Sequence, residues 1–281
     1  MKRIFLLWSL LLFATACFAQ SAQSKWFVNA GLSALNYWGD LRDKRITPKG
    51  VKPSVTAGIS YQLSPHWLSN FSLAFGKLAA FDHDNGLRWY YRNLNFQTSL
   101  FETALTAEYD LIDITEPDDG NYIDNNPKRF TPYAFIGVGL FHFNPYTYDL
   151  SGKKVFLAPL GTEGQPTPYS LWQVSLPYGV GLKYSVTQTF LISAEINLRK
   201  TFTDYIDDVS IHHYLDTTQL LATHGQEAAS LSYRADEIPG NKYSFQNGYR
   251  GNPDRKDGYY SFLLKATLQI FTKRPKFYYG Y

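Results

Sequence analysis

The stretch from Gln173 to Lys200 reads QVSLPYGVGLKYSVTQTFLISAEINLRK. Apolar side chains occupy every second position in both of its halves, and Ser, Gly, Lys, Glu, Asn and Arg fill most positions between them. The polar break around Thr187 separates the halves. Alternation with a period of two, interrupted by a short turn, predicts two antiparallel β-strands.

The same pattern occurs in eight segments along the chain. They are Lys25–Leu35, Pro53–Leu63, Trp67–Leu78, Asn95–Leu111, Thr131–Phe143, Gln173–Tyr184, Phe190–Lys200 and Tyr259–Phe271. The fifth segment is apolar on both faces, so the sequence leaves its phase open. Each segment is close to the length that a tilted strand needs to cross a bilayer.

Aromatic residues gather at the ends of these segments, as they do in the two interfacial girdles of membrane barrels. The residues concerned are Trp26, Tyr37, Trp38, Tyr61, Trp67, Trp172, Tyr184, Phe190, Phe202, Tyr259 and Phe271. We interpret them as girdle residues facing the membrane interface.

The connections between the segments fall into two groups. On one side lie Ser64–His66, Ile112–Phe130 and Ser185–Thr189, and on the other lie the longer Asn36–Lys52, Ala79–Leu94, Asn144–Trp172 and Thr201–Gly258. This layout predicts an all-β fold, an eight-stranded antiparallel transmembrane outer-membrane β-barrel with periplasmic termini and long extracellular loops.

The first residues have the pattern of an export signal. Lys2 and Arg3 precede an apolar run, and small residues follow at Cys17 and Ala19. We expect residues 1–19 to be a cleaved signal peptide and residues 20–281 to form one barrel domain. The alternative is a lipoprotein in which Cys17, the one cysteine of the chain, is acylated.

Composition excludes several classes of protein. Mean hydropathy is −0.28, which is too polar for a bundle of membrane helices. The net charge is +3, with 27 basic and 24 acidic residues, so no strong field favours nucleic acid. We expect outer-membrane lipids as surroundings, no nucleic acid, no cofactor and no small-molecule substrate.

Six charged residues lie on the small or polar faces of the segments. They are Glu102, Glu108, Lys183, Glu195, Arg199 and Lys265. An eight-stranded barrel is only wide enough to be filled by its own side chains, and buried charges need partners. We therefore expect an internal ion-pair network that plugs the barrel. A polar lumen that conducts or binds a small solute is the alternative.

The densest polar cluster follows the seventh segment, at the expected outer rim. It contains Thr203, Asp204, Tyr205, Asp207 and Asp208, followed by Ser210, His212 and His213. Carboxylates with histidine could bind a metal or activate water. We favour ordinary loop structure, with a helix beginning after Asp216. The paired glycines at 137, 139, 179 and 181 indicate close packing rather than phosphate loops.

Two features on the expected periplasmic side could hold a partner. Residues 110–124 contain six acids, among them Asp110, Asp118 and Asp119. The tail after the eighth segment is basic and aromatic, with Lys273, Arg274 and Lys276. They form either a docking surface or a solvated turn and a frayed end.

Several loop motifs resemble a known family. They are YWGDL at Tyr37–Leu41, FHFNP at Phe141–Pro145, LGTEGQ at Leu160–Gln165, PYGVGLKY at Pro177–Tyr184, RKTFTDYIDDVS at Arg199–Ser210 and RGNP at Arg250–Pro253. Together they are similar to the PorG-type outer-membrane proteins of the type IX (Por) secretion and gliding machinery of Bacteroidetes.

The resemblance implies a non-enzymatic component that anchors or positions a periplasmic ring, made of a lipoprotein and its ring partner, in a machine that exports folded cargo. It supplies no catalytic residues, and a paralogue with another role would look the same. Two rival hypotheses remain from the sequence. One is a surface binder or adhesin that uses Leu87–Asn93 and Asn144–Trp172. The other is a rim hydrolase that uses Asp207, Asp208 and His212.

Overall fold

The computed structural model describes residues 25–111, 130–187, 189–241 and 248–270, and no helix in these ranges is long and apolar enough to cross a membrane. Eight long strands dominate it. They are β1 (Lys25–Trp38), β2 (Lys52–Gln62), β3 (Trp67–Phe81), β4 (Asn95–Asp110), β5 (Phe130–His142), β8 (Trp172–Ser185), β9 (Phe190–Thr201) and β10 (Gly258–Gln269). All eight predicted strands are therefore confirmed.

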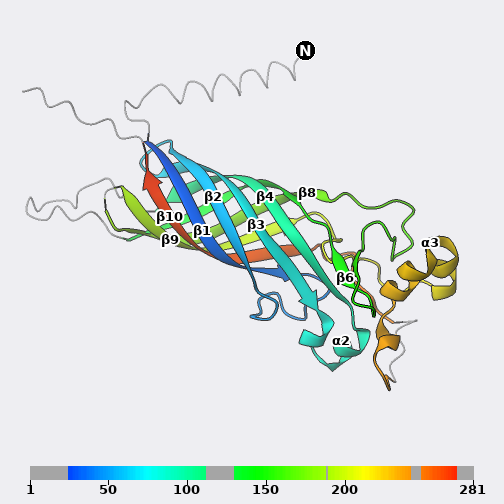
Figure 1. Ribbon diagram of the computed structural model, residues 1–281. Helices are drawn as coiled ribbons and strands as arrows, with labels where there is room; N and C mark the ends of the chain where they lie inside the picture. The colour runs from blue at the N-terminus through cyan, green and yellow to red at the C-terminus, as the bar shows by residue number, and fades with distance from the viewer. Residues whose placement is uncertain (1–24, 112–129, 188, 242–247, 271–281) are drawn as a thin grey trace, which may run out of the picture.

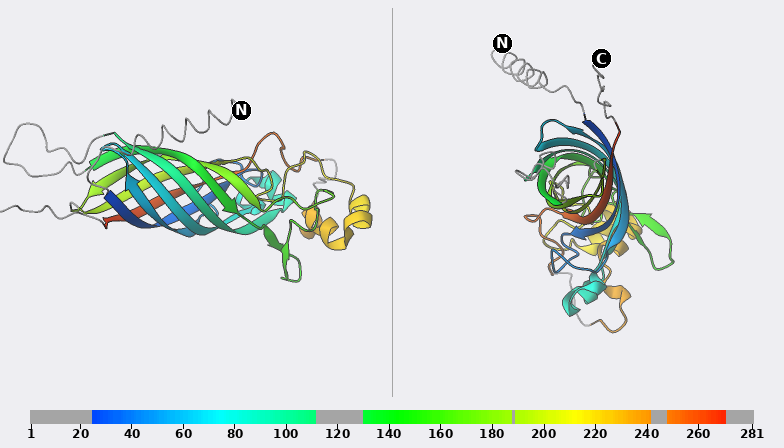
Figure 2. Two further views of the ribbon diagram at one scale, coloured as in Figure 1. Left: turned by 90° about the horizontal axis from the view of Figure 1, so that it is seen from above. Right: turned by 90° about the vertical axis from the view of Figure 1, so that its left-hand side faces the viewer.

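The eight strands close into a barrel. Every neighbouring pair is antiparallel, β3 pairs with β4, and β1 closes the ring by pairing with β10. The view along the axis shows this ring (Figure 2), and the side view shows the tilted strands (Figure 1). Closure gives each wall strand two hydrogen-bonded neighbours, which a sheet in lipid requires.

The two ends of the barrel differ. At one, here named the turn end, β1 begins, β10 ends, and short connections join β2 to β3 and β8 to β9. At the other, the loop end, lie four long connections (Figure 1). They carry η1 (Asp82–Asp84), α2 (Leu87–Arg92), β6 (Tyr146–Tyr148), β7 (Lys154–Phe156), α3 (Thr217–Ser232) and η2 (Ala235–Glu237).

The expected helix after Asp216 is α3. The Asp216 carboxylate accepts hydrogen bonds from the backbone N–H groups of Thr218, at 2.7 Å, and Gln219, at 3.2 Å. These bonds satisfy donors that a helix start otherwise leaves free. Gly225, with φ 85°, interrupts the helix part-way.

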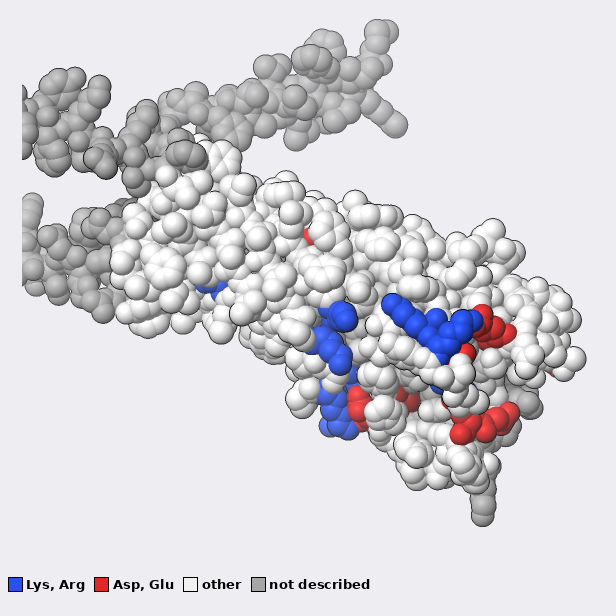
Figure 3. All heavy atoms as spheres, in the orientation of Figure 1, with Lys and Arg blue, Asp and Glu red and all other residues white. Residues whose placement is uncertain are grey.

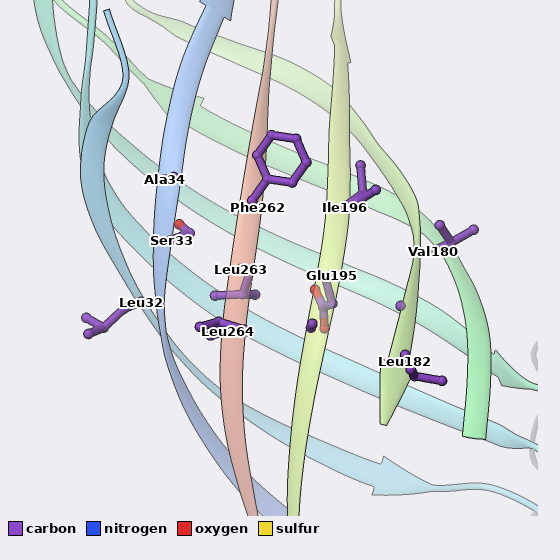
Figure 4. A pocket seen from close by; sticks show the side chains of 12 residues that line it. Leu32, Ser33, Ala34, Val180, Leu182, Glu195, Ile196, Phe262, Leu263 and Leu264 are labelled. Atoms are coloured by element: carbon purple, nitrogen blue, oxygen red, sulfur yellow. The ribbon is translucent and has the colours of Figure 1, made fainter. Parts of the chain in front are cut away.

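The outside of the barrel is apolar. Leu32, Ile136 and Leu264 are 65% or more exposed, and outward-facing aliphatic and aromatic side chains surround them on every wall strand. Figure 4 shows one part of this wall, an open depression of about 710 Å³ where Ile196 and Phe262 lie on the outer face while Glu195 is buried behind it. An apolar surface of this extent on a closed sheet is the surface of a transmembrane barrel.

Aromatic pairs mark the turn end of this apolar band. Trp26 lies 4.8 Å from Tyr61, Trp67 lies 4.9 Å from Tyr109, and Phe130 lies 4.9 Å from Tyr184, measured between ring centroids. They form the expected girdle at that end.

The girdle interpretation is wrong for two residues at the loop end. Tyr37 and Tyr259 are fully buried, because their positions on β1 and β10 point into the barrel. Phe271 lies outside the described residues.

The structure settles the phase of β5. Tyr133, Phe135 and Phe141 are buried inside the barrel, whereas Ile136 and Val138 face outward. Aromatic rings of β5 fit inside because the neighbouring strand β8 carries glycine opposite them. A Cβ on Gly181 would lie 2.4 Å from Cζ of Tyr133, and one on Gly179 would lie 2.7 Å from Cζ of Phe135. The expectation of close packing at these glycines is confirmed.

Candidate functional site: a filled lumen and a loop plug

The half of the lumen nearer the turn end holds a chain of charged groups. The Lys183 ammonium pairs with Glu108 and lies 2.7 Å from Oδ1 of Asp110. The Lys265 ammonium pairs with Glu195 and lies 3.9 Å from Glu108. All of these side chains are at least nine-tenths buried, and they come from four different strands. The chain of charges therefore spans the interior of the barrel.

A second group lies nearer the loop end, around Glu102. Its carboxylate accepts hydrogen bonds from the Ser175 and Tyr259 hydroxyls, both at 2.8 Å, and from Nε of Arg199 at 3.1 Å. Arg199 also donates to the Ser261 hydroxyl at 2.7 Å. The carboxylate thus has several donors, which is what a buried charge requires.

The six charged residues singled out in the sequence thus lie inside the barrel, in two clusters. Asp110 joins them, although the sequence interpretation placed it in the acidic turn. It is the last residue of β4, where the alternation still points inward, and it is 1% exposed. Asp118, Asp119, Lys273, Arg274 and Lys276 lie outside the described residues.

Above the lumen, the long connections form a compact cap that we name the loop plug. The segment 203–210, the C-terminal part of the RKTFTDYIDDVS motif at Arg199–Ser210, lies within it. Thr203, Asp204, Asp207 and Asp208 are 7% exposed or less, and Tyr205 is partly buried. A stretch so polar is buried only because neighbouring loops supply its hydrogen bonds.

Asp207 meets a second carboxyl group at the rim. The Tyr37 hydroxyl lies 2.6 Å from Oδ2 of Asp207 and 2.8 Å from Oδ1 of Asp257, and all three side chains are buried. The backbone N–H groups of Val209 and Ile206 donate to the two carboxyls, each at 2.9 Å. One hydroxyl has one proton, so it cannot donate to both carboxyls at once.

Asp208 belongs to a neighbouring cluster. It accepts a hydrogen bond from Tyr169 at 2.8 Å and another from Thr162. Nε of Arg250 donates to Glu163 at 2.9 Å, and its Nη2 donates to the Asp208 carbonyl at 3.1 Å. Arg250 therefore joins the third and fourth long connections.

The second connection is held by Arg92 and Asp82, which are both fully buried. Nε and Nη2 of Arg92 donate to the two carboxylate oxygens of Asp82, each at 2.6 Å. Arg92 also donates to the carbonyl oxygens of Asp40 and Arg250. One guanidinium thus ties together three of the four loops.

Burial changes the acidity of the plug carboxyls. Desolvation raises the pKa of Asp204 and of Asp208 to about 7, and it raises the pKa of Asp40 to about 6. The pKa values of Asp207 and Asp257 are raised well above the ordinary value, first by burial and then by neighbouring carboxylates. Several carboxyls of the plug therefore hold protons near neutral pH.

The residues of the rim-hydrolase hypothesis do not form one arrangement. Asp207 and Asp208 are buried and engaged by tyrosine and threonine hydroxyls, whereas His212 is exposed and its ring contacts His213 and Tyr249. In the described part of the chain, no group of three or more His, Cys, Asp or Glu side chains could hold a metal ion. The polar motif builds the plug instead.

A comparison with protein families then assigns the chain. The profile of a family described as a domain of unknown function matches residues 2–219, most of the chain. The chain belongs to the DUF6089 family. The matched range contains seven of the wall strands and the whole motif of residues 203–210, and β10 lies beyond it.

Solved structures similar to this DUF6089 chain include outer-membrane and surface proteins. The attachment invasion locus protein Ail of Yersinia pestis, solved with a heparin analogue, is 10% identical with a TM-score of 0.42, and the match covers 88% of this chain and 99% of that one. Neisserial surface protein A matches at 13% identity and a TM-score of 0.41, with the same coverage. A major outer membrane protein of Thermus thermophilus matches at 11% and 0.41, covering 88% and 100%. No curated protein sequence matches.

Proposed function

We propose that the protein is a non-enzymatic outer-membrane component of the type IX secretion and gliding machinery that anchors or positions its periplasmic ring. The observation that carries this proposal is the filled lumen beneath a buried loop plug. A barrel whose interior is occupied by ion pairs and aromatic rings offers a fixed place in the membrane rather than a path through it.

Two further features support the proposal. The sequence motifs of the resemblance, from YWGDL to RGNP, include residues that hold the plug together, such as Glu163, Asp208 and Arg250. The apolar wall with its aromatic girdle suits a permanent membrane address. The ring partners would be reached from the turn end, where the connection 112–129 and the tail after residue 270 leave the described structure.

The proposed orientation places the loop end outside the cell. Cysteine substitution tests it, because Cys17 is the chain's one cysteine. Leu150, at the tip of the β6–β7 hairpin, is 82% exposed, and Val186, in the turn between β8 and β9, is 46% exposed. We expect L150C to react with a membrane-impermeant maleimide on whole cells and V186C to react only after the outer membrane is opened. If only V186C were labelled on intact cells, the barrel would have the opposite orientation to the one proposed.

Crosslinking in native membranes tests the ring partnership. We expect the ring lipoprotein and its partner to be captured, and the capture to fail when residues 112–129 and the tail with Lys273, Arg274 and Lys276 are both replaced by Gly-Ser sequence. The tail and turn carry the expected docking residues, including Asp118 and Asp119. A matched control replaces residues 147–155 of the loop-end hairpin and should keep the capture. Retained capture with both turn-end segments replaced would reject this docking map.

A surface-binding role is the second candidate, and one observation favours it. Large apolar side chains project from the plug, among them Leu87 of α2, at 66% exposed, and Leu150. Tyr148 and Phe156 of the β6–β7 hairpin are also exposed. Two results would support this role over ring anchoring. Whole cells should bind a ligand and lose that binding when these side chains are replaced, and a deletion strain should secrete cargo normally.

A further inference from the structure

The first long connection does not project away from the barrel but lies against its outer wall. Asn36 of β1 and Tyr260 of β10 face outward, yet they are only 1% and 2% exposed. The Asn36 amide donates to the carbonyl oxygens of Thr47, at 2.6 Å, and Lys49, at 3.0 Å. The Tyr260 hydroxyl lies 3.0 Å from both the carbonyl oxygen and the N–H of Thr47. Residues 47–49 therefore cover both side chains.

This position places the loop at the edge of the apolar band. Phe262 follows Tyr260 on the same face of β10 and is 47% exposed. Two residues of a strand span about 7 Å. The headgroup layer of each leaflet is also several ångströms deep, about 5 to 7 Å by the usual bilayer dimensions. A membrane boundary just beyond Phe262 would therefore place residues 47–49 at the depth of the lipid headgroups.

Exposed basic side chains lie on this loop and on the outer faces of nearby strands. Lys44, Arg45 and Lys49 are exposed on the loop, Lys77 is the outward-facing residue that follows Phe75 on β3, and Lys200 follows Leu198 on β9. Since β9, β10, β1, β2 and β3 are neighbours in this order, the five residues form an arc, which we name the basic rim. Figure 3 shows a nearly uncharged wall that ends in a group of basic side chains over this loop.

The charges of the basic rim are mostly uncompensated. Among the described residues, no ion pair joins Lys44, Arg45, Lys77 or Lys200 to a carboxylate, and the Lys49 ammonium donates to the Asp84 carbonyl oxygen. Asp43 is the exposed acid of the loop, and the carboxylate of Asp84 is 3.2 Å from the buried guanidinium of Arg42. The arc therefore carries a net positive charge.

The loop is also fixed in shape. Nη2 of Arg42 donates to the Ala79 carbonyl oxygen of β3 at 3.1 Å. Gly50, with φ +73°, packs so closely on that guanidinium that a Cβ would lie 1.7 Å from Nη2. A loop held from β1, β3 and β10 presents its charges without a large ordering cost.

We propose that the basic rim binds the phosphate groups of anionic lipids in the leaflet at the loop end. Phosphates at headgroup depth complement its charge, and Ile46, which is 67% exposed between the basic residues and Thr47, contacts the acyl boundary. Lipid is the occupant because the basic residues follow the edge of the apolar band around five strands. A binding site for a compact soluble anion would instead converge on one point.

Native mass spectrometry of the whole protein, released from mixed micelles of phosphatidylglycerol and phosphatidylcholine, tests this proposal. Lys44→Gln with Arg45→Gln should weaken phosphatidylglycerol retention by about fivefold for each charge removed, and raised salt should do the same to the wild type. Lys77→Gln with Lys200→Gln removes the two charges of the basic rim that lie on strands, and should weaken retention in the same way. Lys153→Gln with Lys154→Gln removes the same charge from the β6–β7 hairpin and should leave retention unchanged.

Three results would overturn the proposal. The first is wild-type retention in both rim variants. The second is an equal loss in the hairpin variant, which would mean that overall charge alone governs retention. The third is displacement of phosphatidylglycerol by millimolar inorganic phosphate, which would make the rim a site for a free anion. Heat-modifiable migration on gels shows that each variant is folded.

Discussion

Replacing Arg92 with methionine is expected to open the loop plug while leaving the barrel intact. The substitution leaves the fully buried carboxylate of Asp82 without its guanidinium and frees the carbonyl oxygens of Asp40 and Arg250. Removing one partner of a buried ion pair typically costs about 3 to 5 kcal/mol. Arg92→Lys should rescue little, because an ammonium cannot reproduce the two parallel bonds to Asp82.

Limited proteolysis in detergent measures this effect. Arg92→Met should make the long connections sensitive to proteinase K, with the barrel still showing heat-modifiable migration. Arg88→Met, an exposed arginine on the same helix, is the matched control and should behave as wild type. Asp82→Asn combined with Arg92→Met should recover part of the resistance, since it removes the stranded charge. An Arg92→Met plug as resistant as the wild type would show that this pair does not hold the loops.

The plug is expected to lose stability as the pH rises. Burial raises the pKa of Asp208 from 3.8 to about 7, so the folded plug keeps protons that the unfolded loops have already released. The contribution of this carboxyl to plug stability is fully present below its pKa in the unfolded loops. It is lost as the pH rises through its pKa in the folded plug. For Asp208 alone this shift corresponds to about 4 kcal/mol at about 1.4 kcal/mol per pKa unit.

Asp207 gives the sharpest test of this dependence, since it shares the Tyr37 hydroxyl with Asp257 and both carboxyl pKa values are raised well above the ordinary value. Asp207→Asn removes one ionisable group from the pair. We expect little change at pH 5 and a more stable plug at pH 8. Asp149→Asn, at an exposed turn of the β6–β7 hairpin, is the control and should keep the wild-type slope.

Hydrogen–deuterium exchange of peptides covering 203–210 and 248–257, corrected for the intrinsic effect of pH, reports plug opening. We expect slower exchange in the wild type at pH 5 than at pH 8, and a smaller difference in Asp207→Asn. A wild-type plug that becomes more protected between pH 5 and pH 8 would contradict the assignment of raised carboxyl pKa values.

The barrel could be predicted from the sequence because each wall strand repeats one local rule. Inward and outward positions alternate, so the pattern alone places Lys183 inside the barrel and Leu182 on its outer face, without any knowledge of distant contacts. The strand ends differ from the expected ends where both faces of a strand are buried. β1 and β3 run to Trp38 and Phe81, beyond their expected ends, because the loops cover Asn36 and Ala79 on the outer face.

The plug could not be predicted in the same way. Its contacts join residues far apart in the chain, such as Glu163 with Arg250 and Arg92 with the Arg250 carbonyl oxygen, and no period in the sequence marks them. From the sequence alone, polar residues in a loop are expected to be exposed to solvent, because their hydrogen-bond partners are not known. The density of Asp and Ser between Thr203 and Ser210 was the one available signal, and it indicated an unusual loop without showing that the loop is buried.

The central claim is that the barrel is filled and capped, so that it holds a position in the membrane without conducting. Single-channel recording of the purified wild-type protein in a planar bilayer tests this claim most directly, with a general porin as the control for insertion. We expect no stepwise conductance at neutral pH, because the ion pairs from Asp110 to Glu102 and the rings of Tyr133 and Phe135 occupy the lumen. Reproducible steps of ion conductance from the folded protein would contradict it.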